Sequence, residues 1–312
     1  KKTAGAPCLV CVTNLVARVY AAARDPKLTN LGAGTISPEL LPTRKLSRIT
    51  AALSRDLAEL SVGYDLPPGN IDLRREVARR SIEWGCALTP DELVTTCGAS
   101  EAMILALRAV TRPGDAVAIE SPTYYGLLQA IESLGRRAVE IPTCPRDGMQ
   151  VDELAKALDR HRIKAVMVIP NYSNPLGSLM PDEAKRRLVE SCGERGIPVI
   201  EDDIYGDLHH GPERPRALKS FDTTGLVLLC GSFSKTLAPG YRVGFCAPGR
   251  FREKVELLKF SQSLATPTLS QLAIAEFLRT GGYDHHLRGL RRSGARRSRS
   301  RSGRLRIGCR RY

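Results

Sequence analysis

Lys235 lies in the run Ser232-Phe233-Ser234-Lys235, and Arg242 follows it by seven residues. A lysine that forms an imine with an aldehyde must lose its proton, so it needs a site that favours the neutral amine. The two hydroxyl groups and the guanidinium nearby are suited to binding a phosphate ester. A lone lysine is usually a solvated surface residue, but the apolar stretch just before this run predicts a buried strand. We therefore expect Lys235 to be a reactive lysine beside a phosphate site.

A second candidate group is the acidic run Glu201-Asp202-Asp203, which is followed closely by Tyr205. Three carboxylates at the end of a strand can be solvated, or one of them can cap a helix. A buried carboxylate can instead keep a pyridine nitrogen protonated, which makes the ring an electron sink. The residue types alone leave these alternatives open.

Three further motifs follow expected strands. Gly98-Ala99-Ser100 opens an expected helix, whose positive N-terminus and free N–H groups suit a phosphate, although such caps are common. Asn174 precedes a proline, which is ordinarily only a turn signal. Tyr124 could stack on a planar ring or simply pack on a loop. Each motif is weak alone, but all lie where open α/β sheets bind ligands.

The elements that must position these groups alternate between apolar runs and amphipathic stretches from about residue 90 onward. This alternation predicts βα units around a mainly parallel sheet that is covered on both faces. We expect strands at 92–96, 115–120, 138–141, 165–169, 198–200, 226–229 and 243–246. We expect helices at 46–60, 71–84, 100–110, 125–134, 152–161 and 181–195, and a glycine-rich turn at 31–38.

The charge of +14 is concentrated at one end of the chain. Residues 287–312 hold 11 arginines and no acidic residue, which leaves 36 basic and 33 acidic residues in the rest. This tail has no apolar periodicity, so we expect residues 288–312 to be disordered. It could be a nucleic-acid-binding arm, but the abrupt loss of pattern favours an aberrant end of a truncated gene.

The cysteines and the apolar runs indicate a cytoplasmic protein. Nine scattered cysteines suggest reduced thiols, and we find no signal peptide and no apolar run long enough to cross a membrane. Cys8 and Cys11 form a CxxC pair without a second pair at zinc spacing, so two half-buried thiols are expected rather than a metal site. The chain begins Lys1-Lys2, so its natural N-terminus could lie upstream.

Taken together and in this order, the motifs resemble those of class I/II, fold-type I aminotransferases, which bind pyridoxal 5′-phosphate. The resemblance covers about residues 25–287 and implies a three-layer αβα fold with an incomplete small domain. It divides the chain into an N-terminal arm and small-domain segment at 1–47, a large cofactor-binding domain at 48–287, and the tail at 288–312.

The resemblance also assigns roles to individual residues. It implies that Lys235 forms the imine, that Asp202 faces the pyridine nitrogen, and that Asn174 and Tyr205 bond the phenolic oxygen. Gly34 matches a glycine that approaches the substrate. The remaining implied cofactor-binding residues are Ser100, Glu101, Tyr124, Ser232, Ser234, Arg242 and, from a partner subunit of a homodimer, Tyr64.

A finer resemblance concerns runs such as 66–70, 120–126 and 201–208. They resemble the aminotransferase-like domain of MocR-type regulators in the GntR superfamily, in which a winged-helix DNA-binding domain comes first. The resemblance implies either a sensor of an amino acid or amine, or alternatively a free-standing transaminase; enzyme and sensor remain open. No arginine matches the family's carboxylate clamp, so we expect little transaminase activity from the chain as written.

Overall fold

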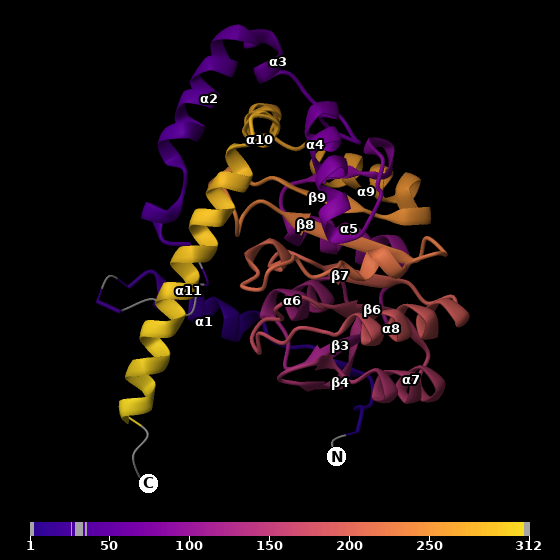
Figure 1. Cartoon of the computed structure of the whole chain (residues 1–312). Coiled ribbons are helices and arrows are strands. Elements are labelled where there is room, and N and C mark those ends of the chain that lie inside the picture. Colours follow the sequence, from indigo (N-terminus) through magenta and orange to yellow (C-terminus); the bar gives the residue numbers. More distant parts are fainter. Residues whose placement is uncertain (1–2, 26, 29–33, 35, 309–312) are drawn as a thin grey trace.

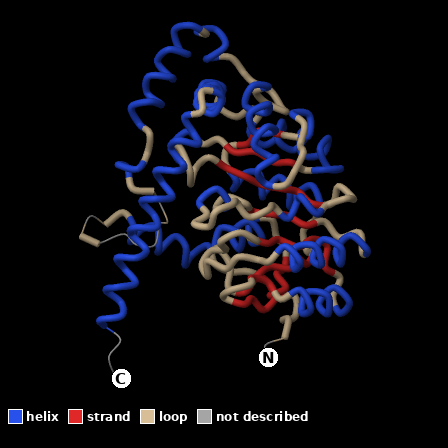
Figure 2. The backbone as a smooth tube through the Cα atoms, in the orientation of Figure 1, coloured by secondary structure: helices blue, strands red, loops and turns tan. Residues whose placement is uncertain are grey.

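The computed structural model describes residues 3–25, 27–28, 34 and 36–308, with side chains described up to residue 296. Most of the glycine-rich turn expected at 31–38 therefore lies outside the described residues. Helices flank a central sheet on both sides (Figure 1 and Figure 2). The described helices are α1 Thr13–Ala23, α2 Thr43–Asp56, α3 Ala58–Val62, α4 Ile71–Ser81, α5 Ala99–Val110, α6 Tyr125–Ser133, α7 Val151–Arg160, α8 Asp182–Glu194, α9 Arg252–Ser263, α10 Thr268–Arg279 and α11 Gly282–Gly308.

The sheet has the strand order β1-β4-β3-β6-β7-β8-β9-β2, and β5 pairs with β4. The five strands from β4 to β8 along this order run parallel, whereas β9, β1 and β5 run antiparallel to their neighbours. This confirms the mainly parallel sheet. The described strands are β1 Cys8–Leu9, β2 Val94–Thr96, β3 Ala116–Ser121, β4 Arg137–Cys144, β5 Gly148–Met149, β6 Ile163–Val168, β7 Val199–Asp202, β8 Val227–Ser232 and β9 Gly244–Ala247.

Buried side chains cover both faces of this sheet, as expected for continuous apolar strands. On one face, α5 and α6 enclose a cluster that includes Met103, Leu127 and Ile200. On the opposite face, α7 and α8 pack over residues such as Leu154 and Val166. The structure thus has the expected three-layer αβα arrangement.

The N-terminal segment attaches to the sheet and to α6. β1 forms an edge strand beside β4. The carboxylate of Glu132 in α6 accepts hydrogen bonds from the backbone of Val12 and Thr13, at 2.8 and 2.9 Å, where α1 begins. Neither β1 nor α1 was expected from the sequence, and a two-residue strand such as β1 is too short to carry a periodicity. Cys8 and Cys11 are exposed free cysteines, not half-buried ones.

The C-terminal segment differs from the expectation of disorder after residue 288. The helix α11 continues to Gly308 and extends beside the body of the domain (Figure 1). Its arginine-rich sequence lacks proline, and arginine and leucine have good helix propensity, so a helix can continue where apolar periodicity has stopped. Arg291 also anchors it, because its Nε donates to the backbone oxygen of Asp207 at 2.7 Å. No described helix is long and apolar enough to span a membrane.

Candidate active site

The loops after three neighbouring parallel strands bring the main candidates together. Asn174 follows β6, Tyr205 follows β7, and Lys235 follows β8. Because the carboxyl ends of parallel strands share one edge of the sheet, these loops meet there. The sheet order β6-β7-β8 makes the three loops direct neighbours.

Lys235 is a partly buried lysine with one close contact. Its Nζ donates a hydrogen bond to the backbone oxygen of Gly34 at 2.7 Å, although the two residues are 201 positions apart. Burial lowers the pKa of Lys235, while the negative charge of Asp202 opposes this shift. Burial therefore makes Lys235 easier to deprotonate to the neutral, nucleophilic amine than a surface lysine is.

The structure separates the three adjacent acids by their partners. Glu201 accepts hydrogen bonds from two backbone N–H groups, at 2.6 and 2.8 Å. Asp203 pairs with Arg214 at 2.6 Å. Asp202 is only 1% exposed, and neither of its carboxylate oxygens has a hydrogen-bond partner among the described residues. Asp202 is thus a buried acid that lacks the donor a buried carboxylate normally has.

The electrostatics of Asp202 follow from this environment. Its pKa is raised to about 7, chiefly by burial and also by the charge of Asp203, while the charge of Lys235 opposes the shift. Burial also raises the pKa of Tyr124 and of Tyr205, and the charge of Asp202 adds to both shifts. The charge of Asp202 therefore bears on Lys235, Tyr124 and Tyr205, the three candidates nearest to it in the proposed chemistry.

Asn174 and Tyr205 form a pair of polar groups in this site. The Nδ2 of Asn174 donates to the Tyr205 hydroxyl at 3.4 Å. Tyr124 is half-buried at the start of α6 and packs against Tyr125, with ring centroids 4.7 Å apart. Its stacking on a planar ligand stays a prediction.

Hydroxyl and guanidinium groups gather on the loop after β8. The Ser232 hydroxyl donates to the Ser234 hydroxyl at 2.9 Å, and Nη1 of Arg242 donates to Ser234 at 3.1 Å. Nη2 of Arg242 also donates to the backbone oxygen of Cys97 at 3.0 Å, next to the N-terminus of α5. These contacts join the two parts of the phosphate cradle expected from the sequence.

Gly98 makes this junction possible. It precedes α5 with φ of +86°, and a Cβ atom there would lie 2.5 Å from Nη2 of Arg242. Ser100 and Glu101 occupy the first turn of α5, where backbone N–H groups have no acceptor within the helix. The Ser100 side chain is exposed, whereas the Glu101 carboxylate pairs with Lys259 at 2.7 Å. Glu101 could therefore contribute its backbone N–H, but its side chain is engaged elsewhere.

Tyr64 has no described contact with the other candidate residues. It is on the segment between α3 and α4, and 79% of its surface is exposed. Within one chain, its position gives it no role in the site.

Sequence reasoning missed a set of residues behind the site. Thr236 is adjacent to Lys235, and its hydroxyl lies 2.7 Å from that of the buried Tyr283. Tyr283 also donates to Asp207 at 3.0 Å, and Asp207 pairs with Arg214 at 2.6 Å. No spacing rule connects residues so far apart in the chain; only the acids after β7 gave a local signal.

Comparisons with known proteins identify the family of the chain. Residues 26–305 match the family model described as aminotransferase class I and II. The crystal structure of LysN, the alpha-aminoadipate aminotransferase of Thermus thermophilus, complexed with N-(5′-phosphopyridoxyl)-L-leucine, superimposes with a TM-score of 0.77 at 32% identity, covering 83% of this chain and 66% of that one. The multiple substrate aminotransferase of Thermococcus profundus gives 0.82 at 27% identity, covering 89% and 70%.

A curated relative of another kind is similar over a comparable part of the chain. The uncharacterized HTH-type transcriptional regulator YdcR of Escherichia coli (strain K12) is 40% identical over 276 residues, which is 88% of this chain. The chain spans little more than half the length of the Escherichia coli regulators that it matches, 59% of one and 54% of another.

Proposed function

Because the chain belongs to the aminotransferase class I and II family, we propose that it is the pyridoxal-phosphate-binding effector or sensor domain of a MocR/GntR-type transcriptional regulator. The single observation that carries the cofactor assignment is the unpartnered carboxylate of Asp202. A buried carboxylate without a donor is costly, and a protonated pyridine nitrogen supplies both the donor and the opposite charge.

The remaining residues suit the other parts of this cofactor. Lys235 provides the amine for its aldehyde, and the Asn174–Tyr205 pair lies on the adjacent loops, where both can donate to an oxygen on the ring. Ser232, Ser234 and Arg242, together with the start of α5, provide hydroxyl, guanidinium and N–H groups for its phosphate.

Pyridoxal phosphate supplies an electron-withdrawing ring that makes a proton on the α-carbon of a bound amino acid acidic. Asp202 would hold the ring nitrogen protonated by facing it as an ionised partner. The amine of Lys235 would be the base that removes the α-proton. Tyr124 would cover a face of the ring and limit the access of water.

Similarity to the regulator supports the sensor role over the enzyme role. The two Escherichia coli transcriptional regulators are 40% and 41% identical to the chain, whereas the two aminotransferases described above are 32% and 27% identical. In this reading, an amino acid or amine displaces Lys235 from the cofactor, and the resulting change in conformation alters DNA binding by a winged-helix domain of the same protein. DNA is then a partner only through that domain.

The second candidate is a free-standing transaminase that exchanges an amino acid and a 2-oxo acid. Its support is the cofactor-suited groups around Lys235 and the 32% identity to an aminotransferase of known structure. Both readings use the same site residues, so the site alone does not choose between them.

We also propose that the protein acts as a homodimer. The exposed Tyr64 then reaches the phosphate site of the partner subunit, which accounts for a large aromatic side chain left in solvent. Sedimentation of the cofactor-loaded full-length protein tests this, because a monomer that binds the cofactor tightly contradicts it.

The sensor role is tested with the protein encoded by the full-length reading frame, after this protein has been loaded with pyridoxal phosphate. A panel of amino acids and amines is added together with a second 2-oxo acid as the amino acceptor, and DNA affinity and formation of the 2-oxo acid derived from each donor are both measured. A change in DNA affinity without formation of the donor's 2-oxo acid supports the sensor. Multiple-turnover 2-oxo acid release with unchanged DNA affinity supports the transaminase and contradicts the sensor.

A further inference from the structure

Tyr283, in the first turn of α11, connects two walls of the site through one hydroxyl group. The side chain is almost fully buried, at 2% exposure. Its hydroxyl lies 2.7 Å from the Thr236 hydroxyl and 3.0 Å from Oδ2 of Asp207. Thr236 is the residue after Lys235, and Asp207 lies two residues after Tyr205. The contact therefore joins the lysine loop to the loop that carries Tyr205.

The direction of these two bonds follows from the groups involved. Arg214 and Arg80 stabilise the ionised form of Asp207 and hold its pKa below the usual range against the opposing effect of burial. An ionised carboxylate can only accept, so Tyr283 donates its single proton to Asp207 and accepts from the Thr236 hydroxyl. Both loops are thus bonded to one buried oxygen atom.

Two further residues of α11 contact the same two loop residues. Nε2 of His286 lies 2.8 Å from the backbone oxygen of Thr236. Nε of Arg291 donates to the backbone oxygen of Asp207 at 2.7 Å. Three positions over the first turns of α11 therefore hold Thr236 and Asp207, which makes α11 a brace across both loops.

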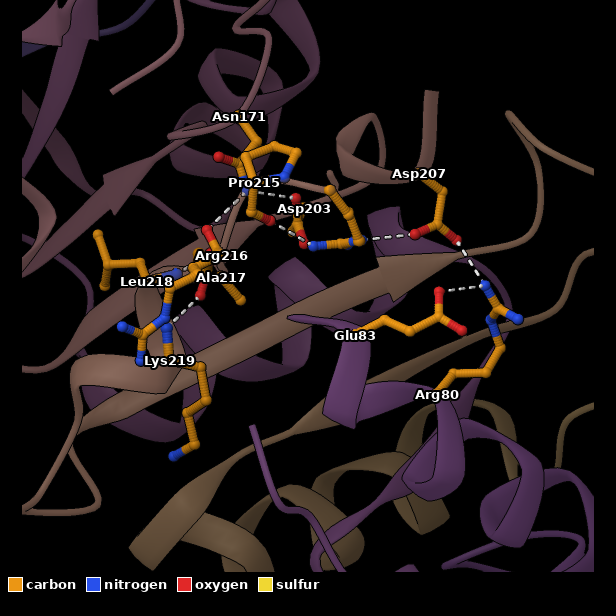
Figure 3. Close-up of polar contacts among 12 residues, drawn as sticks. Arg80, Glu83, Asn171, Asp203, Asp207, Pro215, Arg216, Ala217, Leu218 and Lys219 are labelled. Carbon is orange, nitrogen blue, oxygen red and sulfur yellow. Dashed lines mark hydrogen bonds and ion pairs between the residues drawn. The ribbon is translucent and has the colours of Figure 1, made fainter. Parts of the chain in front are cut away.

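Buried ion pairs make the Asp207 end of this brace rigid. Arg214 bridges Asp207 and Asp203, with 2.6 Å to each, and Asp203 is the neighbour of Asp202. Arg80 pairs with Asp284 of α11 at 2.7 Å and lies over the Tyr283 ring, 4.5 Å from its centroid. Figure 3 shows Asp203, Asp207 and Arg80 along this chain of contacts.

We propose that Tyr283 is a positioning residue that couples the placement of α11 to the relative placement of Lys235 and Tyr205. The proposal rests on the proposed cofactor role of those two residues. It gives α11 a function in addition to packing: a shift of this helix moves both loops. By reciprocity, a change in what the site binds acts on α11.

The test compares Tyr283→Phe, which removes only the hydroxyl group, with Tyr241→Phe. Tyr241 is a matched control on the same lysine loop, because its hydroxyl also lies close to a threonine, 2.8 Å from Thr50, but on α2 instead of α11. Amide hydrogen exchange is measured on the cofactor-free chain over 203–208 and 233–238. These segments contain protected amides, such as that of Leu208, bonded to Tyr205, and that of Leu237, bonded to Phe233.

We expect Tyr283→Phe to speed exchange in both segments by about fivefold, the factor that corresponds to loss of one ordinary hydrogen bond. Tyr241→Phe should leave 203–208 unchanged. Should Tyr283→Phe not fold, Thr236→Val removes the same hydroxyl contact from the other end. Exchange that is unchanged in either segment, or equally fast in the Tyr241→Phe control, overturns the proposal.

A second measurement uses the cofactor-loaded chain. It follows the absorbance band of the bound cofactor in the near-ultraviolet to visible range and determines the pH midpoint, the pH at which the change of this band is half complete. We expect this midpoint to shift in Tyr283→Phe and in Thr236→Val, with the double variant shifting no further than either single variant. A midpoint equal to that of the unsubstituted chain overturns the proposal. If the unsubstituted chain shows no band at all, the proposed function fails, and the exchange measurement still decides the role of Tyr283.

Discussion

Nδ2 of Asn174 lies 3.4 Å from the Tyr205 hydroxyl, and the two residues come from loops after the adjacent parallel strands β6 and β7. The two polar groups are close enough to bind one oxygen atom of a ligand together. They should therefore act as a unit and not as independent contacts.

The first prediction tests this coupling with Asn174→Ala, Tyr205→Phe and the double variant. We expect each single variant to weaken pyridoxal phosphate binding, and the double variant to weaken it by less than the sum. A coupling energy of about 0.5–3 kcal/mol is typical of residues in contact. Cofactor titration by absorbance measures it, and strictly additive effects would show that the two residues do not share a ligand atom.

A second prediction concerns the close approach of Gly98 to Arg242. Gly98→Ala introduces strain at φ of +86° and places a Cβ against the guanidinium, so it should displace Arg242 and weaken cofactor binding. Gly114→Ala is the matched control, because its φ is +85° but nothing lies within 4 Å of the added Cβ. Both variants should lose about 1 kcal/mol or more of stability from backbone strain.

Cofactor affinity separates the two glycine variants. Titration with pyridoxal phosphate should give weaker binding for Gly98→Ala and unchanged binding for Gly114→Ala. Equal affinities in both variants would remove Arg242 from the phosphate site.

The third prediction separates the two neighbouring acids. Asp202→Asn should weaken cofactor binding while leaving the cofactor-free domain folded, because the native carboxylate has no partner to lose. Asp203→Asn should chiefly destabilise the fold, since it leaves the buried Arg214 with one carboxylate fewer, and breaking a buried pair costs about 3–5 kcal/mol. Thermal unfolding and cofactor titration of both variants check this. Weaker cofactor binding in Asp203→Asn together with a destabilised fold in Asp202→Asn would exchange the roles of the two acids.

The fourth prediction is a pH dependence of stability in the cofactor-free chain. Burial raises the pKa of Asp202 from 3.8 to about 7, so the folded state binds a proton that the unfolded state releases. Stability should therefore fall as pH rises from about 4 to about 7. A shift of about three pH units corresponds to a contribution on the order of 4 kcal/mol.

Denaturant unfolding at several pH values measures this contribution by comparing the unsubstituted chain with Asp202→Asn. Glu201, whose pKa is raised to about 8 chiefly by burial, acts in the same direction in both chains and cancels in the comparison. Glu120 cancels only in part, because the charge of Asp202 contributes to the rise of its pKa to about 8. The variant should gain relative stability above pH 7 and none near pH 4. A pH-independent difference would mean that Asp202 is already paired in the folded chain.

The sequence predicted the sheet, its covering helices and the loops of the site because these depend on local patterns. Apolar strands such as 165–169 and the motifs around Asn174 and Lys235 can be recognised within about ten residues. The helix expected over 46–60 is divided, since Leu57 has non-helical backbone angles and separates α2 from α3. The helical course of α11 was missed because its arginines carry no apolar period.

The contacts behind the site could not be predicted for a different reason. Tyr283 and Thr236 are 47 positions apart, and Asp207 is 76 positions from Tyr283. Nothing in the residue types shows that a tyrosine at the start of a helix will meet both loops. The residue types at 201–203 do not separate the three acids; the family resemblance selected Asp202, and its lack of a hydrogen-bond partner among the described residues could be seen only in the structure.

The central claim is that Lys235 is the residue that binds pyridoxal phosphate through its amine. The most direct measurement is borohydride reduction of the cofactor-loaded chain, followed by mass spectrometry of its peptides. We expect the reduced adduct on Lys235 in the unsubstituted chain and in Lys254→Ala, a control at an exposed lysine of α9. Lys235→Ala should show no adduct. An undiminished adduct in Lys235→Ala, or one mapped to another lysine in the unsubstituted chain, would contradict the account.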